Sequence, residues 1–254
     1  MNIVVTVKQV PDPNVAPQFD GDRLKRQGVA GVLDPGDEFG VEAALQLAQA
    51  HGGEVTVVSM GPEAAMEAVR KALSMGANRG VLVSDEALTG ADALTTAKVL
   101  AAAIKKVGFD LVICGVESTD GSTGVVPQMV ASLLEVPSAT FAKSLEVKDG
   151  TLHINRQTEK GYDVVEASLP AVVTVTAGVN EPRYPSFKGI VEAKKKPVDQ
   201  LKVSDLEGLS LEGPTTQSID QITDAPQRGA GEIVTDDGSG AAKIADFLAQ
   251  AKAI

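Results

Sequence analysis

The chain has 254 residues, of which 43% are apolar and 3% aromatic, and its formal net charge is −11 at pH 7. This acidic balance lacks the basic surface that nucleic-acid binding requires, so no nucleic-acid partner is expected. A single cysteine and two histidines exclude an internal disulfide and argue against a metal site built on those residue types.

The amino-terminal sequence MNIVVTVKQV has no charged region before an apolar core and no small-residue cleavage site. It therefore favours a strand over a signal peptide. No apolar run approaches the ~18 residues that a membrane-spanning helix needs. From the sequence we expect a soluble, cytoplasmic protein without membrane insertion.

Short apolar runs alternate with amphipathic segments through the first half of the chain. The pattern predicts strands over residues 2–8, 54–60, 80–84 and 111–115. It predicts helices from the Asp-Pro turn at residues 32–36 to about residue 50, over residues 61–76, over residues 92–107 and again after residue 128. Four such β–α units predict an α/β fold, with a doubly wound parallel sheet of Rossmann-like type.

The stretch DLVICGVESTDGSTGVVPQ at residues 110–128 carries the strongest functional signal. A buried strand leads into a loop of small polar residues and then into a helix, whose first N–H groups lack partners and attract anions. Gly121 and Gly124 would let the backbone approach a phosphate. The loop is neither a Walker A motif nor a GxGxxG fingerprint, so a plain turn with a Ser/Thr cap stays open as the alternative.

The carboxyl ends of parallel strands are where open α/β sheets bind ligands. If the strands at residues 2–8, 54–60 and 111–115 are neighbours, the loops that follow them line one crevice. We interpret that crevice as a nucleotide site. The loop over residues 9–22, rich in Pro, Asp and Gly, is long enough to be functional, although a plain surface loop is the alternative.

The pattern changes to β-rich alternation after residue 138. Strands are predicted over residues 140–147, 151–158, 163–168 and 171–177, and Asp149-Gly150 signals a hairpin between the first two. We expect an antiparallel extension of the parallel sheet. The segment over residues 178–196 then combines aromatic side chains with Arg and Lys, which is typical of a docking surface. The alternative is that Tyr184 and Phe187 pack on their own domain.

The carboxyl-terminal region is polar and without periodicity over residues 213–240, which indicates an extended arm. A last amphipathic helix is predicted over residues 240–254, with Ile244, Phe247, Leu248 and Ala251 on one face. A helix on such a tether can bind another subunit or fold back on its own domain. We divide the chain into an α/β domain over residues 1–212, which includes a docking segment at residues 182–196, and an arm with a terminal helix over residues 213–254.

Several segments together resemble the electron transfer flavoprotein beta subunit. They are VKQVPD, ALSMGANRGVLV, ESTDGSTGVVPQ and LPAVVTVTAGVNEPRYPSFKGIVEAKKK, and the resemblance runs from residue 2 to about residue 209. It implies an adenine-nucleotide-hydrolase-like fold and a heterodimer in which this subunit binds AMP and the alpha subunit holds most of the FAD. It also implies an electron carrier of fatty acid oxidation that performs no bond chemistry itself. In that family electrons come from acyl-CoA dehydrogenases and pass to a quinone oxidoreductase.

The resemblance also assigns residues to the two kinds of site. The implied AMP site consists of Thr6, Asp34, Pro35, Gly36, Asp37, Met60, Gly115, Val116, Glu117, Ser118, Thr119, Asp120, Gly121, Ser122, Thr123, Gly124, Val125 and Val126. The implied partner-docking residues are Pro182, Arg183, Tyr184, Phe187, Lys188, Ile190, Lys194, Lys195 and Lys196. Of these, Phe187 is expected to be the apolar anchor, at a position where relatives often have Leu.

Three departures from the family pattern leave alternatives open. Relatives with aromatics near the flavin carry them where this chain has Pro13 and Gly36, and some relatives carry an acid where it has Gln157. Bifurcating members bind a second FAD in place of AMP through a loop resembling DGDTAxVGP, whereas this loop reads DGSTGVVP; we favour AMP.

An ATP-pyrophosphatase-type enzyme is a competing interpretation, but it would need an SGGxDS-type loop after the first strand, where this chain has KQVPDPN. A universal-stress-type nucleotide-binding protein would leave the segment NEPRYPSFKG at residues 180–189 and the carboxyl-terminal arm without a role.

Overall fold

The computed structural model of the chain describes residues 1–21, 23–26, 28–211, 219–223, 226, 229, 231 and 233–254. Internal contacts divide it into two units, Met1–Ser218 and Ile219–Ile254, and each is described by itself. The start of the predicted arm, residues 213–218, and Asp22 of the predicted loop lie outside the described residues.

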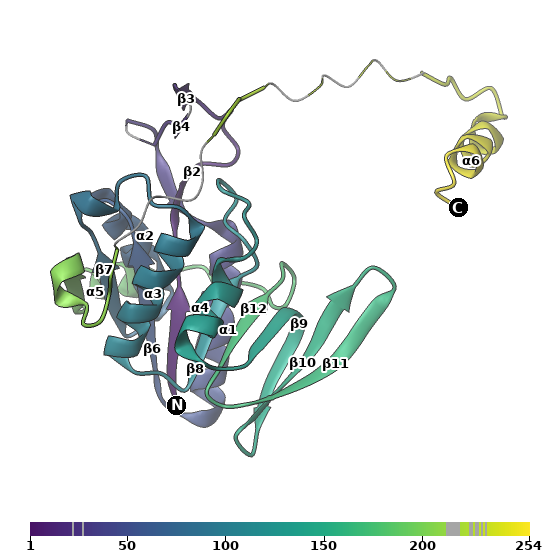
Figure 1. Ribbon diagram of the computed structural model, residues 1–254. Helices are drawn as coiled ribbons and strands as arrows, with labels where there is room; N and C mark the ends of the chain where they lie inside the picture. The colour runs from purple at the N-terminus through teal and green to yellow at the C-terminus, as the bar shows by residue number, and fades with distance from the viewer. Residues whose placement is uncertain are drawn as a thin grey trace. The chain divides into compact units, whose positions relative to one another are not determined.

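One nine-stranded sheet forms the centre of the first unit (Figure 1). Its strands, in order across the sheet, are β11 (Gly161–Ser168), β10 (Thr151–Thr158), β9 (Ser138–Lys148), β12 (Ala171–Val175), β8 (Leu111–Gly115), β1 (Asn2–Thr6), β6 (Glu54–Met60), β7 (Arg79–Val83) and β13 (Val198–Leu201). Two small sheets pair β2 (Gln9–Pro11) with β5 (Gly31–Leu33) and β3 (Phe19–Asp20) with β4 (Arg23–Leu24).

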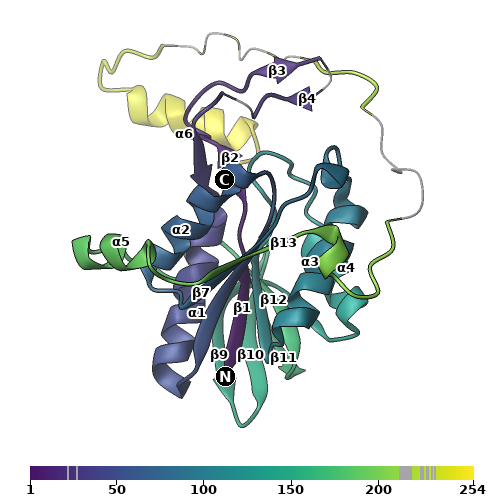
Figure 2. The ribbon, with the colours of Figure 1, turned by 90° about the vertical axis from the view of Figure 1, so that its left-hand side faces the viewer.

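Helices cover both faces of the parallel part of this sheet (Figure 2). The helices of the first unit are α1 (Pro35–His51), α2 (Met66–Met75), α3 (Ala93–Val107), α4 (Val126–Leu134) and α5 (Phe187–Ala193), with short 3₁₀ turns η1 (Glu63–Ala65), η2 (Glu86–Leu88) and η3 (Val203–Asp205). Helices α1 and α2 contribute to one hydrophobic cluster, and α3 and α4 to the other. This two-sided cover is the doubly wound α/β fold that the alternating pattern predicts.

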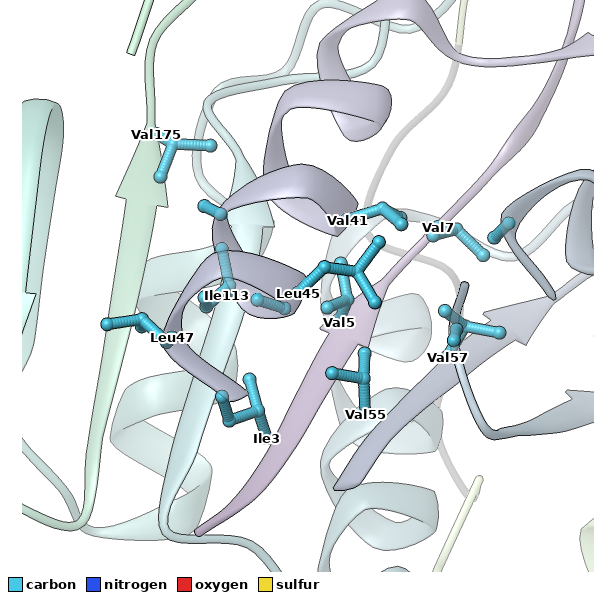
Figure 3. Packing of buried hydrophobic residues seen from close by; sticks show 14 of the residues in the cluster. Ile3, Val5, Val7, Val41, Leu45, Leu47, Val55, Val57, Ile113 and Val175 are labelled. Atoms are coloured by element: carbon cyan, nitrogen blue, oxygen red, sulfur yellow. The ribbon is translucent and has the colours of Figure 1, made fainter. Parts of the chain in front are cut away.

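The two hydrophobic clusters are separated by strand alternation, since successive side chains point to opposite faces. On β1, Ile3 and Val5 belong to the cluster under α1, while Val4 belongs to the cluster under α3. Figure 3 shows Val41 and Leu45 of α1 on the same side of β1 as Ile3 and Val5. Each fully buried Val, Ile or Leu contributes roughly 1.5–3 kcal/mol, so these layers fix the strand order and the edge at which the loops meet.

The predicted strand arrangement in the first half is confirmed. β1 pairs in parallel with both β6 and β8, which makes the strands at residues 2–8, 54–60 and 111–115 neighbours. The hairpin at Asp149-Gly150 is also confirmed, because both residues adopt positive φ, 48° and 76°, as a tight hairpin requires.

Several expectations were wrong in detail. The predicted loop over residues 9–22 contains β2 and β3. β12 is not part of the antiparallel extension, since it pairs in parallel with β8 and with β9, so only β9, β10 and β11 form the antiparallel part. Helix α5 and strand β13 were not predicted.

The second unit contains one further helix, α6 (Gly240–Gln250). An Asp236 side-chain oxygen accepts hydrogen bonds from the backbone N–H groups of Gly238 and Gly240 at 2.8 and 3.1 Å, which organises the start of the helix. Ile244 and Phe247 are 56% and 67% exposed. Within the part of the chain that the structure describes, no helix combines the length and the apolarity needed to cross a membrane.

Candidate functional site

The carboxyl ends of β1, β6 and β8 lie together at one edge of the sheet. Thr6 ends β1 opposite Val58 of β6, and Val5 lies opposite Ile113 of β8. Met60 ends β6, and Gly115 ends β8 just before the small-residue loop. The predicted convergence of the strand ends is therefore observed. The remaining loop residues of the predicted site, Val116, Glu117, Gly121, Ser122, Val125 and Val126, connect β8 to the first turn of α4.

Asp34 is a buried clamp between helix α1 and this loop. It is fully buried and caps α1, where its carboxylate accepts a hydrogen bond from the backbone N–H of Gly36 at 2.8 Å. The same side chain accepts hydrogen bonds from the N–H and the hydroxyl of Thr119, at 2.7 and 3.0 Å. Pro35 occupies the first helical position, where a missing N–H costs nothing. One aspartate thereby fixes where the loop lies relative to α1.

Asp37 is a second buried carboxylate, in the first turn of α1. It is 8% exposed and accepts a hydrogen bond from the backbone N–H of Lys8 at 2.8 Å. Burial raises the pKa of Asp37 well above its ordinary value of 3.8, and the nearby negative charge of Asp34 raises it further, against the opposing effect of the Lys8 N–H. A Cβ atom on Gly115 would lie 2.9 Å from Oδ1 of Asp37, so glycine is the residue that fits there.

Asp120 holds the loop to two cationic side chains. Its side chain is 3% exposed and lies 2.7 Å from Nζ of Lys8 and 2.6 Å from Nη2 of Arg26. Lys8 also donates to the hydroxyl of Ser118 at 3.1 Å. Burial opposes the charged form of Asp120, but Lys8 and then Arg26 outweigh it and hold the pKa of the carboxyl below 3.8. The network joins β1, the region after β4 and the loop after β8.

The backbone of the loop offers donors to an anion. Ser122 and Gly124 have positive φ, 45° and 64°, and left-handed residues of this kind occur in the backbone concavities that bind anions. Within the described residues, the N–H of Ser122 donates to the carbonyl of Ser118 at 2.9 Å, whereas those of Thr123, Gly124 and Val125 donate to no protein acceptor. They directly precede α4, whose N-cap is Val125, and the helix dipole favours negative charge at this end of the helix. This arrangement suits a phosphate.

Sequence reasoning missed two members of this network. Lys8 is the last residue of the predicted first strand and lies two residues beyond the end of β1, and that position at a strand end was the available signal. Arg26 carried no signal, because its partner Asp120 is 94 residues away along the chain.

The predicted docking segment divides into outward and inward side chains. Tyr184 and Phe187 are 95% and 84% exposed, and Ile190 is 48% exposed, so the two aromatic side chains do not pack on their own domain. Helix α5 is capped by Ser186, whose hydroxyl accepts a hydrogen bond from the N–H of Gly189 at 3.0 Å. Lys188, Lys194 and Lys195 are also exposed.

Two of the predicted docking cations are instead internal ties. Nε of Arg183 lies 2.7 Å from Oε2 of Glu42, a side chain that is 5% exposed. Hydrogen bonding to Glu42 raises the pKa of Arg183. Nζ of Lys196 donates to the carbonyls of Leu73 and Ala77 at 2.9 and 2.6 Å. Both side chains therefore hold the segment to the domain, and Pro182 beside Arg183 is half-buried.

Comparison with known proteins finds one family over most of the chain. The family model for the electron transfer flavoprotein domain matches residues 23–206. The electron transfer flavoprotein subunit beta of Mycobacterium tuberculosis is 42% identical over 267 residues, covering 100% of this chain and 99% of that protein. The subunit beta of Thermoanaerobacterium thermosaccharolyticum is 41% identical, covering 92% of each chain. Subunit CarD of the caffeyl-CoA reductase-Etf complex of Acetobacterium woodii is 38% identical, also covering 92% of each.

Proposed function

The chain belongs to the electron transfer flavoprotein family as a beta subunit, and from that premise we propose that it binds AMP, supports an FAD-bearing alpha subunit and docks flavoprotein dehydrogenases. A role in electron transfer, with an alpha subunit as partner, follows from the membership itself. In the proposal the chain holds one nucleotide for architecture and performs no bond chemistry; FAD in the alpha subunit carries the electrons.

The AMP proposal depends above all on the unpaired N–H groups of Thr123, Gly124 and Val125 at the start of α4. A phosphate would accept from them, and the adenine would lie across the ends of β1 and β6. Asp34 supports this by fixing the loop before the ligand arrives, which reduces the ordering cost of binding.

The nucleotide is identified by mass spectrometry of the small molecules released when the purified heterodimer is denatured. We expect one AMP and one FAD per heterodimer. Two FAD and no AMP would instead favour the alternative in which a second FAD occupies the site in place of AMP. The similarity to a subunit of a reductase-Etf complex is the reason to test for this outcome. Release of FAD alone, in one equivalent, would contradict both.

The docking proposal depends on the exposed side chains of α5 and the residues before it. Phe187 and Ile190 offer apolar area, and Lys188 lies between them. Central aromatic or aliphatic anchors surrounded by polar groups are how protein interfaces concentrate binding energy. We propose that an acyl-CoA dehydrogenase receives this surface, and that the reduced carrier then delivers its electrons to a quinone oxidoreductase.

The proposed role of α6 is to bind the alpha subunit. Its exposed Ile244 and Phe247 are three residues apart and therefore lie on one face. Co-expression with a tagged alpha subunit tests this: Ile244→Asp with Phe247→Asp should abolish co-purification, whereas Lys252→Ala beyond the helix should not. Equal recovery of the double variant and wild type would contradict the proposal.

A further inference from the structure

Helix α5 has little of its own to hold it in place. It has seven residues, too few for an isolated helix to be stable in water. Phe187, Ile190 and Val191 are 84%, 48% and 44% exposed, and among the α5 residues only Ala193 is buried. Hydrophobic burial therefore does not explain why α5 has a fixed position.

Two cationic side chains join α5 to α2. Arg70 of α2 caps the carboxyl end of α5, and Lys196, three residues after α5, caps the carboxyl end of α2. Nη1 of Arg70, on α2, donates to the carbonyl of Ala193 at 2.6 Å and to the carbonyl of Lys196 at 2.8 Å. In return, Nζ of Lys196 donates to the carbonyls of Leu73 and Ala77 at 2.9 and 2.6 Å. The carbonyls of Ala193 and Leu73 lie in the last turns of α5 and α2, and those of Lys196 and Ala77 lie just beyond. Carbonyl oxygens at this end of a helix attract positive charge.

The two helices are also in close contact at Gly189. A Cβ atom there would lie 2.6 Å from the backbone carbonyl oxygen of Ser74 on α2, so any larger residue would push the helices apart. Ala193 is the α5 residue that joins the buried cluster, whereas the larger apolar side chains of α5 stay exposed. This is a scaffold that presents a helix outward.

We propose that Arg70 and Lys196 are positioning residues: by reciprocal capping they hold α5 in the orientation that a flavoprotein dehydrogenase recognises. The inference rests on the proposed docking function and names the residues that prepare the surface without touching the partner. If α5 is ordered in only a fraction of molecules, the apparent affinity falls by that fraction. Loss of either cap should therefore act on binding and leave electron transfer within the bound complex unchanged.

The experiment measures steady-state reduction of the complete heterodimer by a purified acyl-CoA dehydrogenase supplied with its acyl-CoA substrate. Arg70→Met and Lys196→Met should each raise KM for the carrier about 10-fold at unchanged kcat, if ordered α5 falls to about a tenth. Amide hydrogen exchange at residues 187–196 should accelerate, while AMP content and reduction of the flavin by dithionite stay at wild-type values. Lys71→Met, on the next residue of α2, is the control and should match wild type.

Two further variants separate the possible outcomes. Gly189→Ala should also raise KM, even though alanine is the better helix former, because it displaces α5 from α2; it provides the same test if a Met variant does not fold. Phe187→Ala tests the docking surface itself. Raised KM for Phe187→Ala with wild-type KM for Arg70→Met, Lys196→Met and Gly189→Ala would overturn the positioning role and leave docking intact. Wild-type KM for all four would overturn docking as well.

Discussion

The carboxylate of Asp34 accepts two hydrogen bonds from Thr119, one from its backbone N–H and one from its hydroxyl, across 85 residues of sequence. The same carboxylate caps helix α1 through Gly36. The start of α1 and the loop after β8 are therefore held by one fully buried side chain. A change at Asp34 should therefore affect the stability of the fold and the position of the loop after β8 together.

Asp34→Ala should destabilise the subunit and release its nucleotide. Loss of the cap and of the acceptor for Thr119 should cost about 2–3 kcal/mol, measured by chemical unfolding, and AMP content per heterodimer should fall. Thr119→Val removes only the hydroxyl bond and should cost about 1 kcal/mol with most of the AMP retained. Full AMP occupancy in Asp34→Ala would show that the loop does not depend on this clamp.

Asp120→Asn should produce a stability loss that depends on pH. The pKa of Asp120 is lowered in the folded chain, so its contribution is present above its ordinary value of 3.8 and is lost as pH falls through the lower folded value. At pH 7 we expect a loss of about 1–2 kcal/mol, limited because Lys8 and Arg26 are 40% and 47% exposed. The difference between variant and wild type should shrink below pH 3.8, as followed by thermal unfolding across pH.

The control for this pH series is Glu146→Gln, which removes an ion pair to Lys148 whose two side chains are 57% and 62% exposed. Its effect should stay within about 0.5 kcal/mol at pH 7. A pH-independent loss in Asp120→Asn would contradict the electrostatic explanation and point to shape or hydrogen bonding alone.

Gly115→Ala adds a single methyl group beside the two buried carboxylates Asp34 and Asp37 and should disturb them. The added Cβ would lie 2.9 Å from Oδ1 of Asp37, and either that carboxylate or the end of β8 must move, at a cost of about 1–3 kcal/mol. Thermal unfolding measures the loss. The control is Ser132→Ala on α4, where the side chain is exposed, and it should leave the melting temperature unchanged. A glycine such as Gly108 does not serve as the control, because its positive φ would strain an alanine. An unchanged melting temperature in Gly115→Ala would show that the site is more tolerant than its packing indicates.

Phe187→Ala should weaken docking without changing cofactor content. Truncating an exposed anchor that becomes buried in a complex costs about 2 kcal/mol, roughly 30-fold in KM for dehydrogenase-driven reduction. Leu133→Ala removes exposed apolar area from α4 and should leave that KM unchanged. Because AMP and FAD content should be normal in both variants, an equal KM in Phe187→Ala and wild type would eliminate the anchor role.

The parallel half of the sheet was predictable because its strands are short continuous apolar runs, of which residues 111–115 are typical. Turn chemistry was equally readable at Asp149-Gly150. The direction of β12 was not, since the run AVVTV is compatible with parallel or antiparallel neighbours. Only the packing between β8 and β9 decides it.

Helix α5 escaped prediction for a physical reason. Its apolar residues face solvent, so the inward-facing periodicity that marks a helix is missing, and Pro185 and Gly189 favour a loop. The site's residue types were visible in the loop after β8, but the ties that organise it were not. Contacts such as those of Arg26 with Asp120 and Arg70 with Ala193 link distant segments, and local pattern holds no information about such pairs.

The outermost strand β11 ends the large sheet, and no strand of the described chain pairs with its free side. Its Tyr162 and Val164 are 64% and 69% exposed, so exposed apolar side chains lie beside backbone N–H and C=O groups that no strand pairs. An edge strand of this kind is a template on which a second copy of the chain can pair, and then a third. We expect newly made chains to polymerise through this edge when they are synthesised without the alpha subunit. Synthesis of both subunits together should keep the beta subunit soluble.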